Sequence, residues 1–290
     1  MKHISQYLSL VKFSHTIFAM PFAMLGFFIA SWRFGLGAVN WSLLLWVVLC
    51  MVTARNAAMA FNRWADRTID IKNPRTRTRE IPSGEISSQS ALWFIIINSF
   101  LFVFFAYQIN AVCFALSPVA LAIVLGYSYT KRFSWLCHLF LGLGLSLAPL
   151  GAYLAVAKVF DLLPLLYAFA VITWVAGFDI IYAIQDIEFD KGQELRSIPA
   201  RFGMDKALWI STCLHVVTAV CIVSCAILLH TEFGMSFLMI LGSMLFLVLL
   251  FYQHWILKDH NLNRINLAFF TTNGIASVVL ACFTILDFYF

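Results

Sequence analysis

Charged side chains are scarce in this chain of 290 residues, where Asp, Glu, Lys and Arg together make up only 11%. Hydrophobic residues make up 62%, and the mean hydropathy is +0.89. So few polar residues cannot cover a water-soluble globule of this size, which excludes an ordinary soluble domain. The apolar residues form long continuous runs, whereas a transmembrane β-barrel is built from alternating segments of about ten residues. The sequence therefore predicts an all-α integral membrane protein.

Several common functional signals are also missing. The seven cysteines are scattered through apolar segments without the spacing of a metal site, so we expect them to pack as small buried hydrophobes. The first apolar run lacks a small-residue cleavage site, which favours a retained helix over a signal peptide. The formal net charge of +5 comes mostly from loop charges that orient a membrane protein, so it predicts no nucleic-acid partner.

Runs of about 17 to 25 apolar residues are long enough to cross a bilayer as helices. Nine such runs occur, at residues 15–32, 41–61, 91–109, 111–129, 134–157, 161–184, 207–229, 235–257 and 265–288. They predict a single membrane domain over residues 1–290, folded as one bundle of nine helices around a central cavity. Two similar polar segments, within residues 41–85 and 161–205, are compatible with two pseudo-repeat halves.

Lys and Arg are distributed very unequally over the loops between these runs. Of the 19 basic residues, only Arg33 and Lys158 fall on one side of the predicted membrane, and Arg55 falls inside the second run. All the others lie at the N-terminus or in the loops of the opposite side. Because basic loops are retained in the cytoplasm, we expect a multi-pass protein of the inner membrane with a cytoplasmic N-terminus and an external C-terminus.

Polar residues at helical spacing form two stripes near the cytoplasmic ends of the second and sixth runs. They are Asn62, Asp66 and Asp70 in the first stripe, and Asp179, Tyr182, Asp186 and Asp190 in the second. On a continuous helix, each set lies on one face. Carboxylates are costly in hydrocarbon, so at membrane depth they usually face a cavity, a cation or a substrate path. Oxygen ligands without His or Cys suit Mg²⁺, whose coordination substrate phosphates complete, so the stripes predict a phosphorylated ligand.

Basic residues near the stripes are suited to the negative charge of a leaving diphosphate. They are Arg67, Lys131, Arg132 and Lys191, which lie within or just after polar segments. We interpret Arg75, Arg77 and Arg79 instead as loop charges that set the topology or contact lipid head groups.

Arg55 is predicted to lie one to two turns inside the second run, where a cation is costly. Its spacing from Asn62 continues the face of the first stripe inward. Two explanations are equally open at this point: a salt bridge with Asp179, or contact with an anionic acceptor.

Together these residues resemble the UbiA-type intramembrane aromatic prenyltransferases. The family's first signature, Asn-Asp-x-x-Asp-x-x-x-Asp, is similar to NRWADRTID at Asn62–Asp70, and its Asp-x-x-x-Asp signature is similar to DIEFD at Asp186–Asp190. A Tyr-x-x-x-Lys motif matches Tyr127–Lys131, and RTRTREIPSG follows the first signature. The motifs occur in order over most of the chain. One departure is Arg63, which replaces the family Asp and puts the identity of the acceptor in doubt.

The resemblance implies a Mg²⁺-dependent polyprenyltransferase that uses an allylic polyprenyl diphosphate and an aromatic acid. It implies metal binding by Asn62, Asp66, Asp70, Asp186 and Asp190, diphosphate binding by Arg67, Tyr127, Lys131 and Lys191, and acceptor binding by Arg55 and Tyr182. It further implies catalytic roles for Asp179, Asp186 and Asp190, with Asp179 accepting a proton from the acceptor or orienting it. We expect the product to be a precursor of a membrane quinone.

We expect 4-hydroxybenzoate as the acceptor, with a dihydroxynaphthoate-type acceptor as the alternative. A different class of function is a cation- or proton-coupled transporter, in which intramembrane carboxylates relay ions. Alternating access predicts a charged path that reaches both faces, whereas the external halves of these helices carry few ionisable groups. The distribution of charge therefore favours the enzyme.

Overall fold

The computed structural model of the chain describes residues 2–11, 18–35, 38–257, 265 and 267–290, and these residues form helices and no strand. Eight helical segments of this described part are long and apolar enough to cross a membrane. They are α3 (Trp41–Ala65), α5 (Ser88–Ile109), α6 (Ala111–Thr130), α7 (Cys137–Ala157), α8 (Leu162–Ala183) with its continuation, α11 (Met204–Phe233), α12 (Phe237–Trp255) and α13 (Asn273–Asp287) with the turn before it. The predicted all-α membrane bundle is confirmed.

The remaining predicted span, residues 15–32, corresponds to α2 (Met20–Gly35), which has 16 residues. Residues 12–17 lie outside the described part of the chain. The difference between nine predicted and eight observed spans therefore comes from the short described length of α2.

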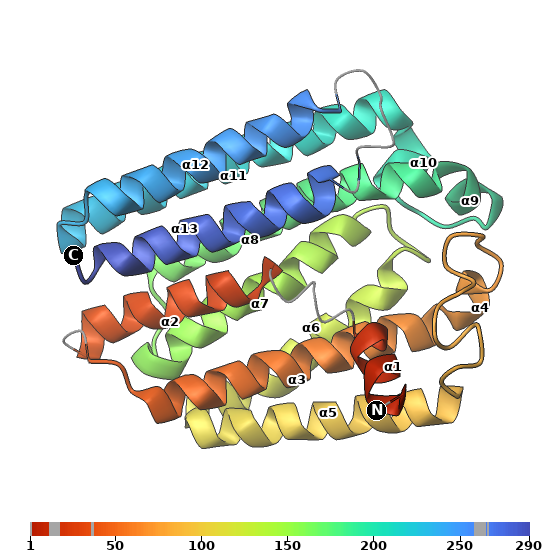
Figure 1. Cartoon of the computed structure of the whole chain (residues 1–290), viewed down its shortest axis with the longest axis horizontal. Coiled ribbons are helices and arrows are strands. Elements are labelled where there is room, and N and C mark those ends of the chain that lie inside the picture. The colour runs from red at the N-terminus through yellow and green to blue at the C-terminus, as the bar shows by residue number, and fades with distance from the viewer. Residues whose placement is uncertain (1, 12–17, 36–37, 258–264, 266) are drawn as a thin grey trace.

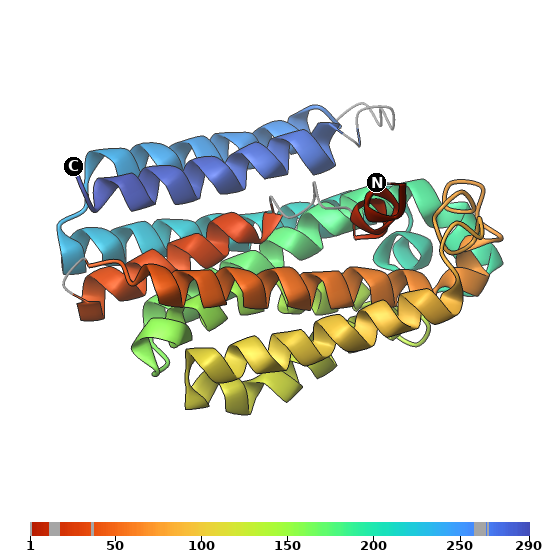
Figure 2. The same ribbon diagram turned by 60° about the horizontal axis from the view of Figure 1, so that its bottom comes forward.

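Short elements gather at the end of the bundle opposite the C-terminus (Figures 1 and 2). They are α1 (Lys2–Leu10), α4 (Arg67–Asp70), the tight turn η2 (Ile184–Asp186), α9 (Ile187–Gly192) and α10 (Ile198–Phe202). The segment between α4 and α5, residues 71–87, runs at the same end in a series of turns and is called the bridging loop below. A π-helical segment, η4 (Leu267–Thr272), precedes α13. Both polar motifs lie at this end.

Side-chain caps set the start of several long helices. Asn110 separates α5 from α6, and its Oδ1 accepts a hydrogen bond from the Cys113 N–H at 2.8 Å. Its Nδ2 also donates to the carbonyls of Leu154 and Ala155 at the end of α7, each at 3.0 Å. One asparagine thus begins a helix and ties the α5–α6 turn to the neighbouring α7, which satisfies backbone groups that hydrocarbon would leave unpaired.

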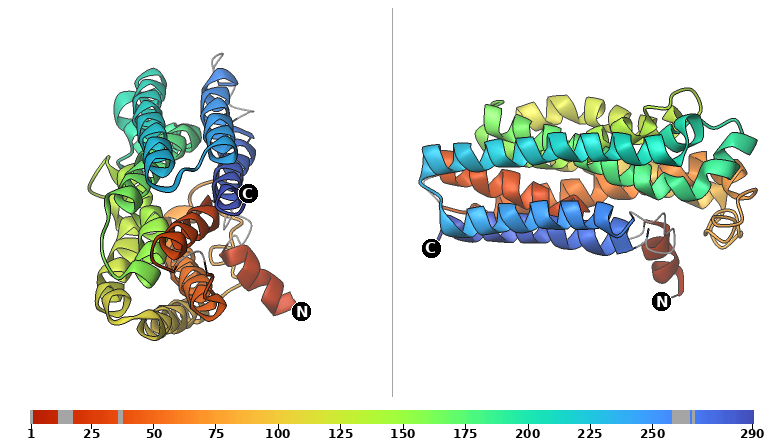
Figure 3. Two further views of the ribbon diagram at one scale, coloured as in Figure 1. Left: turned by 90° about the vertical axis from the view of Figure 1, so that its left-hand side faces the viewer. Right: turned by 90° about the horizontal axis from the view of Figure 1, so that it is seen from above.

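Glycines allow α7 to approach both of its main neighbours closely. A Cβ placed on Gly26 of α2 would lie 2.2 Å from the Pro149 carbonyl oxygen of α7. A Cβ placed on Gly142 of α7 would lie 2.4 Å from the Ile172 carbonyl oxygen of α8. Small residues of this kind let membrane helices pack by close backbone contact. The left view of Figure 3 looks along the bundle and shows the long helices gathered in one assembly. Most residues of α8 are buried in it.

Neither polar motif lies on one continuous helix, so the predicted straight stripes are wrong in this detail. The helix α3 ends at Ala65, and Asp66 has φ −91° and ψ 4° before α4 begins. The helix α8 ends at Ala183, and Asp186 has φ −105° and ψ 8° before α9 begins. The regular helix is thus interrupted at Asp66 in the first motif and at Asp186 in the second, each four residues before the next carboxylate, Asp70 or Asp190.

Candidate active site

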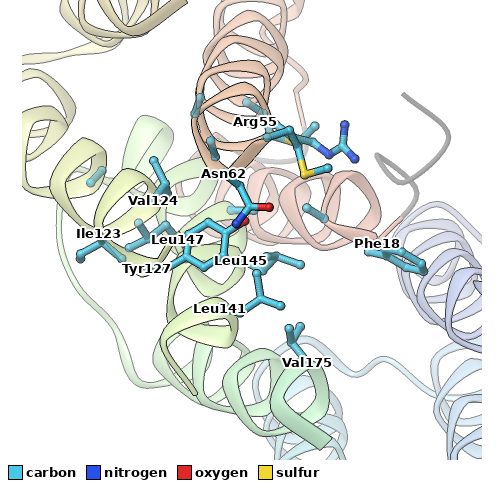
Figure 4. Close-up of a pocket in the computed structure, with 18 of the residues that line it drawn as sticks. Phe18, Arg55, Asn62, Ile123, Val124, Tyr127, Leu141, Leu145, Leu147 and Val175 are labelled. Atoms are coloured by element: carbon cyan, nitrogen blue, oxygen red, sulfur yellow. The ribbon is translucent and has the colours of Figure 1, made fainter. Parts of the chain in front are cut away.

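A cavity of about 730 Å³ lies among α2, α3, α6, α7 and α8. Its lining on α3 runs from Arg63 back to Val47, which corresponds to a rise of about 24 Å. Figure 4 shows Arg55 and Asn62 projecting from α3, and Tyr127 from α6, into this cavity. Polar lining residues concentrate at the end that carries the motifs, and the rest of the wall is mostly apolar. The cavity therefore offers one polar site at the mouth of a long hydrophobic channel.

Most of the predicted site residues line this single cavity. They are Arg55, Asn62, Tyr127, Lys131, Asp179, Tyr182, Asp186 and Asp190, contributed by α3, α6, α8, η2, α9 and the residue that follows α6. The two motifs, far apart in sequence, thus contribute to the same hollow. Residues of the two motifs can therefore act on one ligand in the same polar site.

The two aspartates of the first motif are buried beside the cavity and paired with basic side chains. Asp66 is 2% exposed and lies 3.1 Å from Lys131 Nζ and 3.2 Å from Arg132 Nη2. Asp70 accepts two hydrogen bonds from Arg79 Nη1, at 3.0 and 2.9 Å. These cations provide the counter-charges that make burial of the carboxylates possible.

The second motif has its own polar partners. Asp186 accepts hydrogen bonds from Arg75 Nε at 3.1 Å and from Asn73 Nδ2 at 3.3 Å, and it forms a further ion pair with Arg75 Nη2. Burial lowers the pKa of Arg75, but its hydrogen bond with Asp186 and the charge of that carboxylate outweigh this effect, so the pKa is raised overall. Asp190 accepts a hydrogen bond from Ser197 Oγ at 2.9 Å.

The bridging loop therefore connects the two motifs directly. Arg79 binds Asp70 of the first motif, while Asn73 and Arg75 bind Asp186 of the second. The sequence interpretation of Arg75 and Arg79 as loop charges did not include these ion pairs with the motif carboxylates. Their alternation in RTRTR matched a basic loop equally well, and only the folded path of the loop brings them to the carboxylates.

Arg55 does not pair with Asp179. Its Nη1 donates to the Val11 carbonyl at 3.2 Å, on the segment that follows α1. Asp179 pairs instead with His138 of α7, whose Nδ1 lies 2.7 Å from Asp179 Oδ2. The sequence carried no signal for His138 beyond its position soon after the Tyr127–Lys131 motif, so its role was missed.

Two predicted diphosphate ligands lie apart from the cavity wall. The guanidinium of Arg67 lies 4.6 Å from the centre of the Trp64 ring, and its Nη1 donates to the Trp64 carbonyl at 2.6 Å. Lys191 is exposed, and its Nζ lies 3.7 Å from Glu188 Oε1. Neither residue is part of the cavity lining.

Arg63, the residue that departs from the family signature, has an acidic partner of its own. It lines the cavity and forms a buried ion pair with Glu80 of the bridging loop. Glu80 also accepts a hydrogen bond from Ser9 of α1. The Arg63–Glu80 pair thus fixes the bridging loop to α3 and links both to the N-terminal helix.

The donor chemistry fits a hard divalent cation such as Mg²⁺. In the described residues, no three His, Cys, Asp or Glu side chains already form a metal-binding group. Mg²⁺ typically needs only one or two carboxylates, because water and substrate phosphates complete its octahedral shell. Asp186 and Asp190 line the polar end together with the Asn62 amide. Asp66 and Asp70 are not part of the lining, but each contacts a cation that is, Lys131 and Arg79 respectively. An oxygen-only set of this kind suits a metal shared with a phosphorylated substrate.

Comparison with known proteins identifies the family of the chain. It is 27% identical to a 4-hydroxybenzoate octaprenyltransferase of Tolumonas auensis over 259 residues, which cover 87% of this chain and 88% of the relative. The apo structure of a UbiA homologue from Aeropyrum pernix K1 has a TM-score of 0.83 and 30% identity, covering 94% of this chain and 98% of that one. A UbiA homologue from Archaeoglobus fulgidus, solved with DMAPP and Mg²⁺, has a TM-score of 0.75 and 21% identity, covering 98% and 99% of the two chains. The sequence model of the UbiA prenyltransferase family matches residues 19–275, and this multi-pass membrane protein therefore belongs to that family.

Proposed function

We propose that this protein transfers a polyprenyl group from an allylic diphosphate to an aromatic acid, with 4-hydroxybenzoate as the acceptor and Mg²⁺ as the cofactor. The observation that carries the proposal is the cavity itself, which joins the residues of both motifs to a long apolar channel. An allylic polyprenyl diphosphate has the same division into a charged head and an apolar tail. The curated relative named 4-hydroxybenzoate octaprenyltransferase supports the choice of acceptor.

The polar end of the cavity is the proposed site of the diphosphate. Asn62, Asp66, Asp70, Asp186 and Asp190 are the proposed metal ligands, and bound Mg²⁺ would neutralise negative charge on the leaving group. Tyr127 and Lys131 line this end and are the proposed diphosphate ligands. Arg67 and Lys191 lie off the cavity wall, so we do not assign them this role.

The acceptor is proposed to bind deeper, beside Arg55, Asp179 and Tyr182. The guanidinium of Arg55 offers a counter-charge for the carboxylate of an aromatic acid. The apolar walls on α6 and α7 exclude water, and this exclusion protects an allylic cation from hydrolysis until the ring attacks it.

We further propose an orientation in the inner membrane, with the motif end facing the cytoplasm and the C-terminus outside. Within the described part of the chain, the basic bridging loop and both motifs share one end of the bundle, which agrees with the bias of Lys and Arg toward cytoplasmic loops. Reporter fusions at the bridging loop and at the C-terminus test this orientation. If a reporter that is active only outside the cytoplasm is active when fused at the bridging loop, the proposed orientation is wrong.

We propose that the single domain consists of two pseudo-repeat halves, with the first motif within residues 41–85 and the second within residues 161–205. Support comes from the similar backbone bends at Asp66 and Asp186, each followed by a second aspartate four residues later.

The proposed function is tested with protein purified in detergent or liposomes and supplied with Mg²⁺ and a polyprenyl diphosphate. Aromatic acids, including 4-hydroxybenzoate and a dihydroxynaphthoate, are offered singly, and the prenylated products are identified by mass spectrometry. We expect a prenylated 4-hydroxybenzoate and stoichiometric release of diphosphate. A product formed only with the dihydroxynaphthoate would overturn the choice of acceptor. Lack of diphosphate binding by folded protein would overturn the proposed enzymatic function.

A further inference from the structure

A buried histidine lies in the cavity wall without a role in the proposed function. His138 is in the first turn of α7, is 2% exposed and lines the cavity. Its Nδ1 is 2.7 Å from Asp179 Oδ2 on α8. Burying an imidazole in a membrane bundle is costly unless both ring nitrogens have partners.

The second ring nitrogen of His138 has a backbone partner. The Ile198 N–H donates to His138 Nε2 at 3.4 Å, so Nε2 acts as an acceptor. In a neutral imidazole the other nitrogen then carries the hydrogen, and Nδ1–H donates to Asp179. The contact with Ile198 therefore makes His138 the donor and Asp179 the acceptor of the hydrogen bond between them.

This contact also ties Asp179 to the second motif. Ile198 begins α10, and the preceding residue, Ser197, donates to Asp190 Oδ2 at 2.9 Å. His138 thus lies between a carboxylate inside the cavity and the segment that contacts Asp190. Two hydrogen bonds, from Ile198 to His138 and between His138 and Asp179, therefore connect that segment to Asp179.

Asp179 is placed to meet the acceptor ring. It lies about two turns along α8 from Asp186, deeper than the polar end of the cavity. Its side chain is 23% exposed, toward a wall that also contains Val175 and Phe178. Its Oδ2 is engaged by His138, and within the described part of the chain its Oδ1 has no hydrogen-bond partner.

We propose that His138 is a positioning residue for Asp179. The role of Asp179 as a proton acceptor is the one that the family resemblance implies, and it is assigned to the proton which the aromatic ring loses during prenyl transfer. The C–O bond of the prenyl diphosphate breaks, and its electron pair leaves with the diphosphate. A ring carbon beside the acceptor hydroxyl forms the new C–C bond, and the proton on that carbon passes to Asp179 Oδ1 as the ring regains its aromaticity. This inference rests on the proposed function and extends it to a residue outside the motifs.

Variants of the pair and a matched control test the proposal. Asp179→Asn removes the proton acceptor, and His138→Ala removes its positioning donor. His138→Asn restores an N–H near the place of Nδ1. Thr218→Val is the control, because Thr218 Oγ1 is 2.8 Å from Thr173 Oγ1 in a buried contact between α8 and α11 that does not line the cavity.

Turnover, the KM for the prenyl diphosphate and the isotope effect with ring-deuterated acceptor are measured for each protein, using the acceptor that the wild type prenylates. We expect Asp179→Asn to lower kcat by about 100- to 10,000-fold, the usual contribution of a general base. His138→Ala should lower it by about 10-fold or more, the scale on which partners that orient a functional side chain act. Both should leave the KM for the diphosphate within twofold of wild type and raise the isotope effect, because removal of the ring proton becomes slow.

His138→Asn should recover part of the turnover lost in His138→Ala, and Thr218→Val should behave as wild type in all three measurements. The inference is overturned if His138→Ala behaves like Thr218→Val, if its isotope effect stays at the wild-type value, or if it loses diphosphate binding together with turnover. Failure of the proposed function is a separate result, since the wild type itself would then form no prenylated product.

Discussion

The close contact between α7 and α8 leads to a sharp prediction for Gly142→Ala. A Cβ on Gly142 would lie 2.4 Å from the Ile172 carbonyl oxygen, whereas real Cβ atoms essentially never come closer than 3.0 Å to another heavy atom. The obstacle is backbone and cannot rotate away, so the helices must separate by at least about 0.6 Å. Overpacking of this kind costs about 1–3 kcal/mol, offset by up to about 1 kcal/mol from the better helix propensity of alanine.

Catalysis should be more sensitive than stability to this separation. Gly142 lies one turn from His138 on α7, and the opposing α8 carries Asp179 and leads through η2 to Asp186. A displacement of about 1 Å at a reacting centre can lower turnover about 100-fold. We therefore expect Gly142→Ala to lose about 1–2 kcal/mol of stability and to lower kcat by about 10-fold or more.

The assay compares Gly142→Ala with Gly151→Ala on the same helix, where an added Cβ meets no atom within 4 Å. Thermal unfolding in detergent and the rate of diphosphate release are measured for both variants. Gly151→Ala should match or exceed the wild type in melting temperature. Wild-type stability and turnover in Gly142→Ala would refute the inferred backbone contact between α7 and α8.

Three other perturbations have distinct expected outcomes. Asp66→Asn and Asp186→Asn should both abolish prenyl transfer. Only Asp66→Asn should also lower the melting temperature clearly, by the equivalent of about 1–3 kcal/mol. The reason is that Asp66 is buried between two cations. Melting temperatures equal to each other would contradict this difference. Glu80→Gln should cost about 3–5 kcal/mol by leaving the Arg63 charge buried and unpaired, and Arg63→Gln combined with Glu80→Gln should recover much of that loss in a double-mutant cycle. Additive losses in the cycle would show that the pair is not coupled. Chelation of divalent cations with EDTA should stop turnover reversibly. The melting temperature should change little, because the described carboxylates of both motifs already have basic or hydroxyl partners. Turnover that persists in EDTA would exclude the proposed cofactor.

Local patterns predicted the membrane bundle and much of the polar end. Apolar runs located the long helices to within a few residues, because a span needs a minimum length of hydrocarbon-compatible sequence wherever it lies in the fold. The motif spacing also selected Asn62, Lys131, Asp186 and Asp190, all of which line the cavity. The bends at the motif aspartates were not predicted, since helical periodicity alone continues a helix through any residue other than a strong breaker.

Local sequence patterns could not predict which side chains pair with each other across the site. Arg75, Arg79 and Glu80 belong to one basic loop, yet they contact Asp186, Asp70 and Arg63 respectively. His138 gave no local signal, and its contact with Asp179 depends on how closely α7 approaches α8 at Gly142.

Composition, apolar length and the spacing of the acidic residues thus determined by themselves that this chain crosses a membrane and carries two separated polar motifs. Tertiary structure alone decided which cation neutralises each carboxylate and which histidine holds Asp179. The physical reason is that hydrophobic length and helical period are properties of neighbouring residues, whereas an ion pair depends on the path of loops and on the distance between helix axes, which the whole bundle sets.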